Sequence, residues 1–120
     1  MIGMADKVVY TLAHVGINAD DREQAAMLCR LFGVLFGWKE KEGNSSFFAD
    51  KGIEIMKEPY LGTHGHIAIG VNDMQAAISE LEAKGHAFDP ATRKTDAEGN
   101  TKAIYLQGEY CGFALHLVQV

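Results

Sequence analysis

The sequence predicts an α+β protein made of two similar units, each with the order strand, helix, strand, strand, strand. The first observation is a repeat: the stretch His14–Ile17 recurs as His66–Ile69, 52 residues later, and Asp21 recurs at the same step as Asp73. The second is that apolar residues at helical spacing follow each copy, and the third is that short strand-like segments come next. In a chain of 120 residues, such a repeat is typical of two copies of one small unit.

The first unit begins with a strand over residues 8–17, which are rich in β-branched and apolar side chains. Asn18, Asp20 and Asp21 follow and can cap a helix, where acidic side chains also suit the positive end of the helix dipole. The next apolar residues recur at helical spacing and predict a helix of about four turns that ends at Gly37: Ala25, Ala26, Leu28, Cys29, Phe32 and Leu35.

Three short strands complete the first unit, at residues 38–41, 46–49 and 53–57. A turn at residues 50–52 makes a hairpin of the last two. The only credible linker between the units is the segment 58–63, which contains proline and glycine and is short.

The second unit repeats this order. A strand is expected over residues 66–71, followed by a helix that Asp73 caps and Gly85 ends. Another strand starts at residues 86–88, before a polar loop at residues 89–100 that is longer than its counterpart in the first unit. The last two strands are expected at residues 102–107 and 113–119.

Strand periodicity separates an apolar face from a face that carries chemistry, because successive side chains of a strand point to opposite faces of a sheet. His14 then shares a face with Leu12 and Gly16. His66 likewise shares a face with Ala68. On the last strand of each unit a metal-competent side chain stands between two apolar ones: Glu54 between Ile53 and Ile55, and His116 between Leu115 and Leu117.

Four of these side chains occupy matching places in the repeat, His14 and His66 on the first strands and Glu54 and His116 on the last. A two-fold pairing of the units would bring all four to one centre. Three imidazoles and one carboxylate suit a divalent transition metal such as Zn, Ni, Co, Fe or Mn, whereas Mg and Ca prefer oxygen ligands. A lone histidine in a strand is most often a structural residue, but four repeat-related coincidences favour a metal site.

The composition excludes several classes of partner. With a net charge of −5 and no basic run, the chain is not expected to bind nucleic acid. No apolar stretch approaches the roughly 20 residues of a membrane span, and no signal peptide precedes the first strand, so we expect no membrane contact and a cytoplasmic location. Cys29 and Cys111 have no CxxC spacing and are expected to be reduced.

Four segments carry the most specific part of the pattern: Leu12–Val15, Ile53–Ile55, Gly65–Ala68 and Ala114–Leu117. Together they resemble the vicinal oxygen chelate superfamily, which contains glyoxalase I, methylmalonyl-CoA epimerase, extradiol dioxygenases and fosfomycin or bleomycin resistance proteins. The resemblance implies a single glyoxalase-like domain over residues 1–120, made of two βαβββ modules at about 7–58 and 64–120. It also implies a cupped mixed sheet with the helices on its outer face, and a metal held by His14, Glu54, His66 and His116.

Two positions depart from the family pattern. Glyoxalase I and the epimerases usually have glutamate at the position of His116, where it is a ligand and a proton-transferring base. Glyoxalase I of the bacterial type has an arginine that contacts glutathione four residues after the first ligand, and this chain has Asn18 there. Both differences weaken the expectation of a glutathione thioester substrate, although a relationship to lactoylglutathione lyase stays open.

The expected chemistry is proton transfer next to a carbonyl, in the isomerisation or epimerisation of a small α-hydroxy or α-oxo substrate. Chelation of two adjacent substrate oxygens by a cation stabilises negative charge as it develops. Glu54 is the only carboxylate of the ligand set and is therefore the expected catalytic base. Phe48, Met56 and Tyr105 are candidate walls of the substrate pocket, although core packing is the more ordinary role of each.

Four other side chains carry weaker signals. Arg93 and Lys102 border the long polar loop and could hold an anionic substrate group, but a solvated surface role is the more common one. His64 and His86 have no repeat partner and are expected on the surface or beside the site.

Two alternatives to a lyase or isomerase stay open. The chain could be a non-catalytic small-molecule binding module like the resistance proteins, although those frequently lack the ligands that are present here. It could also be an extradiol-type dioxygenase, although a fourth protein ligand would crowd oxygen and substrate on the iron.

The linker over residues 58–63 bears on the assembly. Because it is short for folding one unit back over its twin, a homodimer is favoured over a monomer. In such a dimer, the first unit of one chain would complete the site with the second unit of the other.

Overall fold

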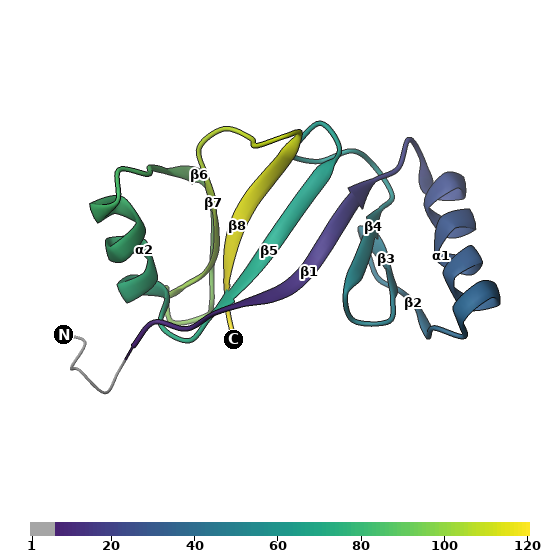
Figure 1. The fold of residues 1–120 in the computed structure, drawn as a ribbon, viewed down its shortest axis with the longest axis horizontal. Helices are drawn as coiled ribbons and strands as arrows, with labels where there is room; N and C mark the ends of the chain where they lie inside the picture. Colours follow the sequence, from purple (N-terminus) through teal and green to yellow (C-terminus); the bar gives the residue numbers. More distant parts are fainter. Residues whose placement is uncertain (1–6) are drawn as a thin grey trace.

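The computed structural model describes residues 7–120, which contain two helices and eight strands (Figure 1). Their order along the chain is β1 (Tyr10–Asn18), α1 (Arg22–Phe36), β2 (Glu40–Glu42), β3 (Ser46–Ala49), β4 (Ile53–Met56), β5 (Gly65–Val71), α2 (Met74–Ala83), β6 (Phe88–Thr95), β7 (Thr101–Leu106) and β8 (Phe113–Gln119). The α+β class and the repeated order of strand, helix and three strands are therefore confirmed. Neither helix is long and apolar enough to span a lipid bilayer.

All eight strands form one mixed sheet in the order β2-β3-β4-β1-β5-β8-β7-β6. Within each half the first strand pairs in parallel with the last, β1 with β4 and β5 with β8. The halves join edge to edge, because β1 and β5 pair antiparallel at the centre of the sheet. Figure 1 shows the sheet curving between α1 and α2, which lie outside it at opposite ends. The expected cupped sheet with helices on its outer face is thus confirmed.

The helices begin and end where the sequence places their signals. The Asp21 side chain accepts a hydrogen bond from the Gln24 N–H at 2.8 Å, and Gly37 ends α1 in the left-handed conformation, with φ at 69°. Asp73 caps α2 by accepting from the Ala76 N–H at 3.1 Å. Each such cap satisfies a backbone donor of the first helical turn and typically contributes about 1 kcal/mol.

The hydrophobic core is divided into two clusters, one in each half. In the first, Ala25 and Cys29 of α1 pack with buried side chains of β3 and β4: Phe47, Ala49 and Ile55. In the second, Met74 and Ala77 of α2 pack with buried side chains of the neighbouring strands: Val71, Phe88, Ile104 and Leu117. Both clusters lie on the helix side of the sheet, so the opposite face of its central strands is free to carry a site.

Residues 57–64 connect the two halves by crossing the end of β1. Because β4 and β5 both flank β1, the connection spans only two strand spacings, about 10 Å. The Asn18 side chain holds it by donating to the carbonyl oxygens of Tyr60 (3.3 Å) and Gly62 (2.9 Å) and accepting from the Tyr60 N–H (3.1 Å). The expectation that the linker is too short to bring both units together in one chain is therefore wrong.

The expected polar loop at residues 89–100 is a strand in its first half, because β6 continues to Thr95. β6 is an edge strand whose side chains are mostly exposed, so it lacks the apolar alternation by which strands are recognised. Pro90 is tolerated because the pairing of β6 with β7 is irregular between Asp89 and Lys94.

Two smaller differences concern β1 and β2. The register of β1 against β5 shifts between Leu12 and His14, so Leu12 lies opposite Ile69 on the helix-side face. The prediction that Leu12 shares a face with His14 is therefore wrong. The strand expected at residues 38–41 lies slightly later, at Glu40–Glu42.

Candidate metal centre

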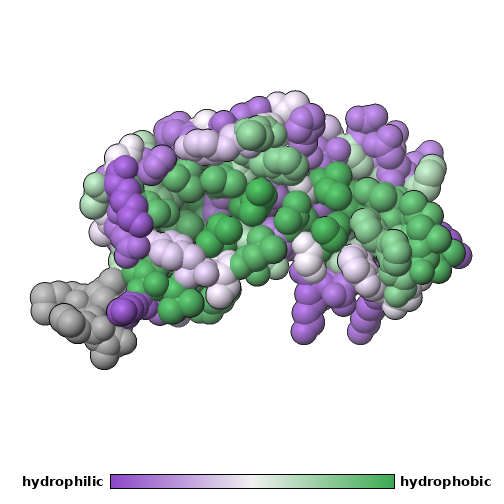
Figure 2. Space-filling view, viewed as in Figure 1, coloured by the Kyte–Doolittle hydropathy of each residue, from purple (hydrophilic) through white to green (hydrophobic). Residues whose placement is uncertain are grey.

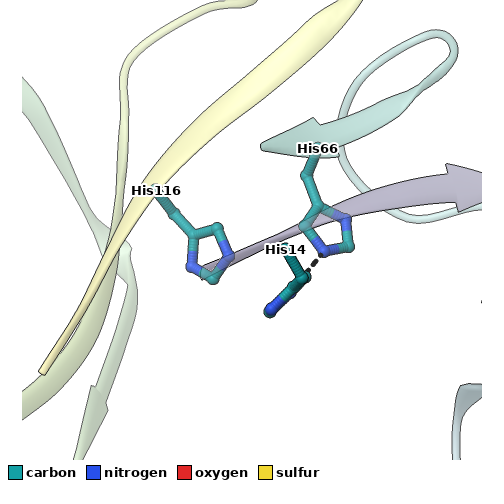
Figure 3. Close-up of side chains that lie close together, drawn as sticks. All are labelled: His14, His66 and His116. Atoms are coloured by element: carbon teal, nitrogen blue, oxygen red, sulfur yellow. Dashed lines mark hydrogen bonds between the residues drawn. The ribbon is translucent and has the colours of Figure 1, made fainter. Parts of the chain in front are cut away.

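The four predicted ligand side chains converge on the sheet face that lies opposite the helices. One nitrogen from each of His14, His66 and His116 lies within 4.8 Å of the other two, and the three rings point toward one another from β1, β5 and β8 (Figure 3). Glu54 Oε1 lies 2.9 Å from His66 Nε2 and 3.3 Å from His14 Nε2. All four belong to one chain, so assembling this cluster requires no residue from a second subunit.

Gly16 separates Glu54 from His66 in the sheet, and its lack of a side chain lets these two residues make contact. It lies on β1 directly between Glu54 of β4 and His66 of β5. Side chains two strands apart start about 10 Å from each other, so they make contact only across a residue with little or no side chain. A Cβ at Gly16 would overlap the His66 imidazole. The missing side chain therefore provides the space in which the His66 ring lies.

Ala68 has the corresponding place in the second half. It lies on β5 between His14 of β1 and His116 of β8, whose ring centroids are 5.9 Å apart. Gly16 and Ala68 are separated by the 52-residue step of the repeat. Each half thus supplies one small residue that lets two ligands from its flanking strands approach.

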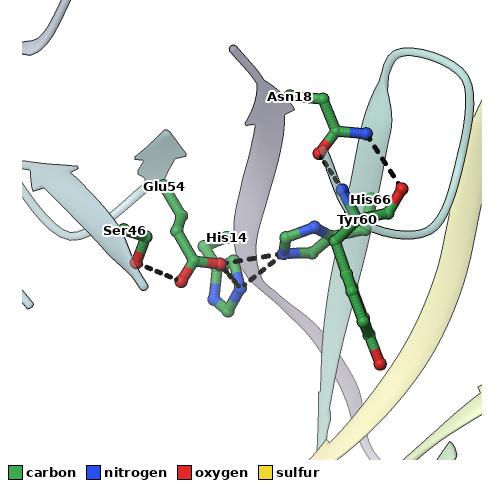
Figure 4. Close-up of polar contacts among 6 residues, drawn as sticks. All are labelled: His14, Asn18, Ser46, Glu54, Tyr60 and His66. Carbon is green, nitrogen blue, oxygen red and sulfur yellow. Dashed lines mark hydrogen bonds and ion pairs between the residues drawn. The ribbon is translucent and has the colours of Figure 1, made fainter. Parts of the chain in front are cut away.

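Glu54 is held in its ionised form by a network of hydrogen bonds (Figure 4). Burial alone would raise the pKa of its carboxyl, but hydrogen bonds from His14, His66 and Ser46 outweigh burial and hold this pKa well below its usual range. The Ser46 hydroxyl, which is itself buried, donates to Glu54 Oε2 at 2.7 Å. Ser46 therefore fixes one carboxylate oxygen and leaves Oε1 toward the histidines.

His116 is neutral at physiological pH. Burial, together with the nearby His66 and His14, lowers the pKa of its ring to about 4. The ring stacks on Tyr105 with centroids 4.4 Å apart, which fixes its plane. A neutral imidazole is the form that coordinates metal ions.

The polar atoms of this cluster fit a divalent transition ion. Both ring nitrogens of His116 and Nδ1 of His66 are buried and have no hydrogen-bond partner among residues 7–120. A buried polar atom without a partner costs free energy, so such atoms usually mark a ligand or a solvent molecule. Three nitrogens and a carboxylate form a donor set that suits these ions better than Mg or Ca.

The acid stability of the metal-free protein should report on His116. Between pH 6.5 and pH 4 the unfolded chain binds a proton at this residue that the folded chain does not, so stability falls as pH is lowered through this window. From pH 7 to pH 5 the expected loss is about 2 kcal/mol in the free energy of unfolding, measured by urea denaturation. His116→Leu should remove this loss, whereas the exposed His86→Leu should not. An unchanged loss in His116→Leu would contradict the assignment.

The cluster opens into a cavity of about 440 Å³. Met56 and Tyr105, predicted as pocket walls, line it, while Phe48 does not line it and instead packs edge-on against the His14 ring at 5.7 Å. Sequence reasoning missed the remaining lining residues: Ser45, Tyr60, Thr92, Lys94, Ala103 and Val118. Tyr60 comes from the segment between the halves, where no strand periodicity indicates the direction of a side chain.

Four other side chains singled out in the sequence lie away from the cavity lining. Arg93 donates to Thr101 Oγ1 and to the Gly99 carbonyl oxygen at 2.9 Å, so it stabilises the β6–β7 turn. Lys102 lines a different hollow, beside α2. His64 packs beside Phe113, with ring centroids 5.9 Å apart, and His86 is exposed.

Several solved structures have this fold. A hypothetical protein from Bacillus halodurans C-125 superposes with a TM-score of 0.62 and 19% identity, covering 92% of this chain and 94% of that one. A methylmalonyl-CoA epimerase in complex with methylmalonyl-CoA and NH4+ gives 0.60 and 15%, covering 90% and 92%. The methylmalonyl-CoA epimerase from Mycobacterium tuberculosis gives 0.58 and 17%, covering 90% and 86%.

The sequence alone finds no such relatives, since no protein-family model and no curated protein matches it. At these identities the superpositions show a shared fold. The fold expected from the resemblance to the vicinal oxygen chelate superfamily is thereby confirmed.

Proposed function

We propose that this chain is a metal-dependent enzyme of the isomerase or lyase type that transfers a proton next to a carbonyl of a small α-hydroxy or α-oxo compound. The observation that carries the proposal is the convergence of three histidines and one ionised carboxylate in a single cavity. The occurrence of the same fold in methylmalonyl-CoA epimerases supports it, because epimerisation is a reaction of this class.

His14, Glu54, His66 and His116 would hold a divalent transition metal such as Zn, Ni, Co, Fe or Mn. When bound, this ion supplies an electrophile that polarises a substrate carbonyl and makes the adjacent C–H bond more acidic. The neutral state of His116 and the ionised state of Glu54 are those needed for both residues to act as ligands.

Glu54 would also accept the proton from carbon. Its carboxyl is ionised at neutral pH and lines the cavity, and Ser46 restrains Oε2 so that Oε1 faces the reacting centre. Tyr105 and Tyr60 form a wall of the same cavity, with ring centroids 5.9 Å apart. A positioned base of this kind typically contributes 10²–10⁴-fold to rate.

We further propose that the substrate carries no glutathione. Asn18 stands at the position where glutathione-dependent relatives have arginine. Its side chain forms hydrogen bonds to the backbone of residues 60 and 62. That side chain therefore holds the cavity wall instead of offering a charge to a peptide cofactor.

The test is metal content combined with solvent deuterium exchange. Protein purified without chelators should contain about one transition ion per chain, and in D2O it should catalyse deuterium incorporation next to the carbonyl of small 2-oxo acids or hydroxyketones, followed by NMR. Protein without a bound ion after metal supplementation would contradict the metal centre. Ligand binding without exchange would favour a binding module, and oxygen consumption would favour a dioxygenase.

We also propose that the chain forms a homodimer through the outer face of α1. Met27, Leu31 and Val34 follow one another at helical spacing on this face and are 70%, 49% and 71% exposed. They border a groove of about 550 Å³ that Ile17 and Leu28 also line. Figure 2 shows hydrophobic side chains gathered over α1 at the right of the view. Apolar faces of this kind usually mark a protein interface, and a two-fold dimer would cover the same face on both chains.

Replacing Leu31 with glutamate should convert this dimer to a monomer, because each chain would bury an unpaired charge in the interface. Light scattering at micromolar concentration measures the change. Ser79→Glu adds the same charge on the exposed side of α2 and should leave the mass unchanged. A wild-type mass of one chain would refute the dimer without affecting the metal centre.

A further inference from the structure

We propose that the cavity selects substrates with a second anionic group, a carboxylate or a phosphate, and that Lys94 on β6 recognises this group. The inference rests on the proposed function, since it assumes that the substrate's reacting end lies at the histidines. It names the chemical class of substrate, which the metal centre alone leaves open.

Lys94 lies on the same wall of the cavity as His116. On the neighbouring strands Lys94 pairs with Ala103, and Ala103 pairs with Val118, two residues after His116. Ala103 and Val118 line the cavity as well, so Lys94 is joined to the strand of His116 by a row of cavity-lining residues. The next residue toward the N-terminus, Arg93, does not line the cavity and bonds to the β6–β7 turn instead.

The Lys94 ammonium is available to a ligand. Within the part of the chain that the structure describes, no ion pair and no side-chain hydrogen bond involves it. Arg22 and Lys57, which line a separate hollow near the start of α1, are by contrast both paired with Glu42. The positive charge of Lys94 also acts on the histidine cluster, because it contributes to lowering the pKa of His116.

The charge of the cavity favours an anion. Its lining contains one carboxylate, that of Glu54, and one ammonium, that of Lys94. With a divalent ion bound, the net charge of the cavity is positive, although the chain as a whole carries −5. A positive cavity in an acidic protein attracts and orients anionic ligands.

The dimensions indicate a small ligand. Two strand spacings, about 10 Å at the backbone, separate β8 from β6, and the His116 and Lys94 side chains both reach into this span. The volume of about 440 Å³ is at the lower end for ligand pockets. A compound with a chelating 2-hydroxy or 2-oxo acid at one end and an anion a few bonds away fits both limits.

The experiment compares ligands that differ only in the second anion. The full chain is loaded with Co²⁺, whose visible absorption reports ligand binding at the metal, and titrated with malate, 2-hydroxyglutarate and 2-hydroxybutyrate. We expect malate or 2-hydroxyglutarate to bind about tenfold more tightly than 2-hydroxybutyrate, whose methyl group replaces the second carboxylate of malate. A parallel comparison of 3-phosphoglycerate with glycerate distinguishes phosphate from carboxylate recognition.

Three variants assign the preference to Lys94. Lys94→Met should abolish it in a protein that still binds Co²⁺ and 2-hydroxybutyrate, and Lys94→Arg should retain most of it. Lys102→Met removes a lysine outside the cavity and should have no effect. The preference should also weaken as salt rises, since an exposed ammonium is screened by ions.

Two results would overturn the inference. One is equal affinity for ligands with and without the second anion, and the other is a preference that survives in Lys94→Met. If the protein does not bind Co²⁺, the proposed function fails on that measurement. The same ligands are then compared on metal-free protein by NMR, where absence of the preference refutes the role of Lys94 separately.

Discussion

Replacing Gly16 with alanine should reduce the affinity of the protein for divalent transition ions by about a hundredfold or more. The added methyl group would occupy the space of the His66 imidazole, so that ring must rotate away from Glu54 and His14. One ligand and its hydrogen bond to the carboxylate are then lost together. Loss of well-placed partners around a metal usually costs 10–100-fold in affinity, and loss of a direct ligand costs more. Calorimetric titration with Zn²⁺ or Co²⁺ measures the effect.

Gly52→Ala is the matched control, because it makes the same chemical change beside β4. A Cβ at Gly52 would meet no atom within 4 Å, and its backbone is not in the left-handed region. This variant should bind metal like the wild type. Far-ultraviolet circular dichroism checks that Gly16→Ala still folds. Wild-type metal affinity in folded Gly16→Ala would show that His66 is not part of the centre.

Replacing Glu54 with glutamine should leave a metal-binding protein whose deuterium exchange is 10²–10⁴-fold slower, as expected when a general base is removed. The amide keeps the shape of the side chain and an oxygen that can coordinate, but it cannot accept a proton from carbon. Because hydrogen bonds hold the Glu54 pKa well below its usual range, wild-type exchange should not fall by protonation of this residue between pH 6 and pH 8. NMR in D2O gives the rate, and elemental analysis gives the metal content.

Ser46→Ala provides a graded comparison for this prediction. It keeps the carboxylate but removes the 2.7 Å hydrogen bond that holds Oε2, so exchange should fall about tenfold. Ser45 is next to it and also polar, but forms no side-chain bond to Glu54 within residues 7–120, so Ser45→Ala should slow exchange less. Full activity in Glu54→Gln would remove Glu54 from the role of base.

The convergence of the ligands could be predicted from the sequence because it depends on two strong local signals. The 52-residue step relates His14 to His66, and alternation along the strands places Glu54 and His116 on the face away from the helices. Apolar neighbours such as Ile55 and Leu117 must be buried under a helix, which leaves the opposite face for polar side chains. Pattern and burial therefore point to the same face.

The walls of the cavity could not be predicted in the same way. Lys94 lies on an edge strand whose polar sequence is indistinguishable from a loop, and its direction depends on an irregular register. The sequence predicts Ser46 on a strand, but its bond to Glu54 depends on the pairing of β3 with β4, which periodicity along one strand does not reveal. Tyr60 owes its position to the contacts of Asn18 with the connecting segment.

The antiparallel pairing of β1 with β5 has a consequence for the dynamics of the chain. Each half contributes one imidazole from its first strand and one ligand from its last. A bound ion would therefore link the two halves across the seam, the antiparallel pairing of β1 with β5. Amide hydrogens that bond across this seam, such as that of Asn18, which donates to the His64 carbonyl oxygen, should then exchange with solvent far more slowly after metal loading. Metal loading would thus decide whether the molecule behaves as one cooperative unit or as two hinged lobes.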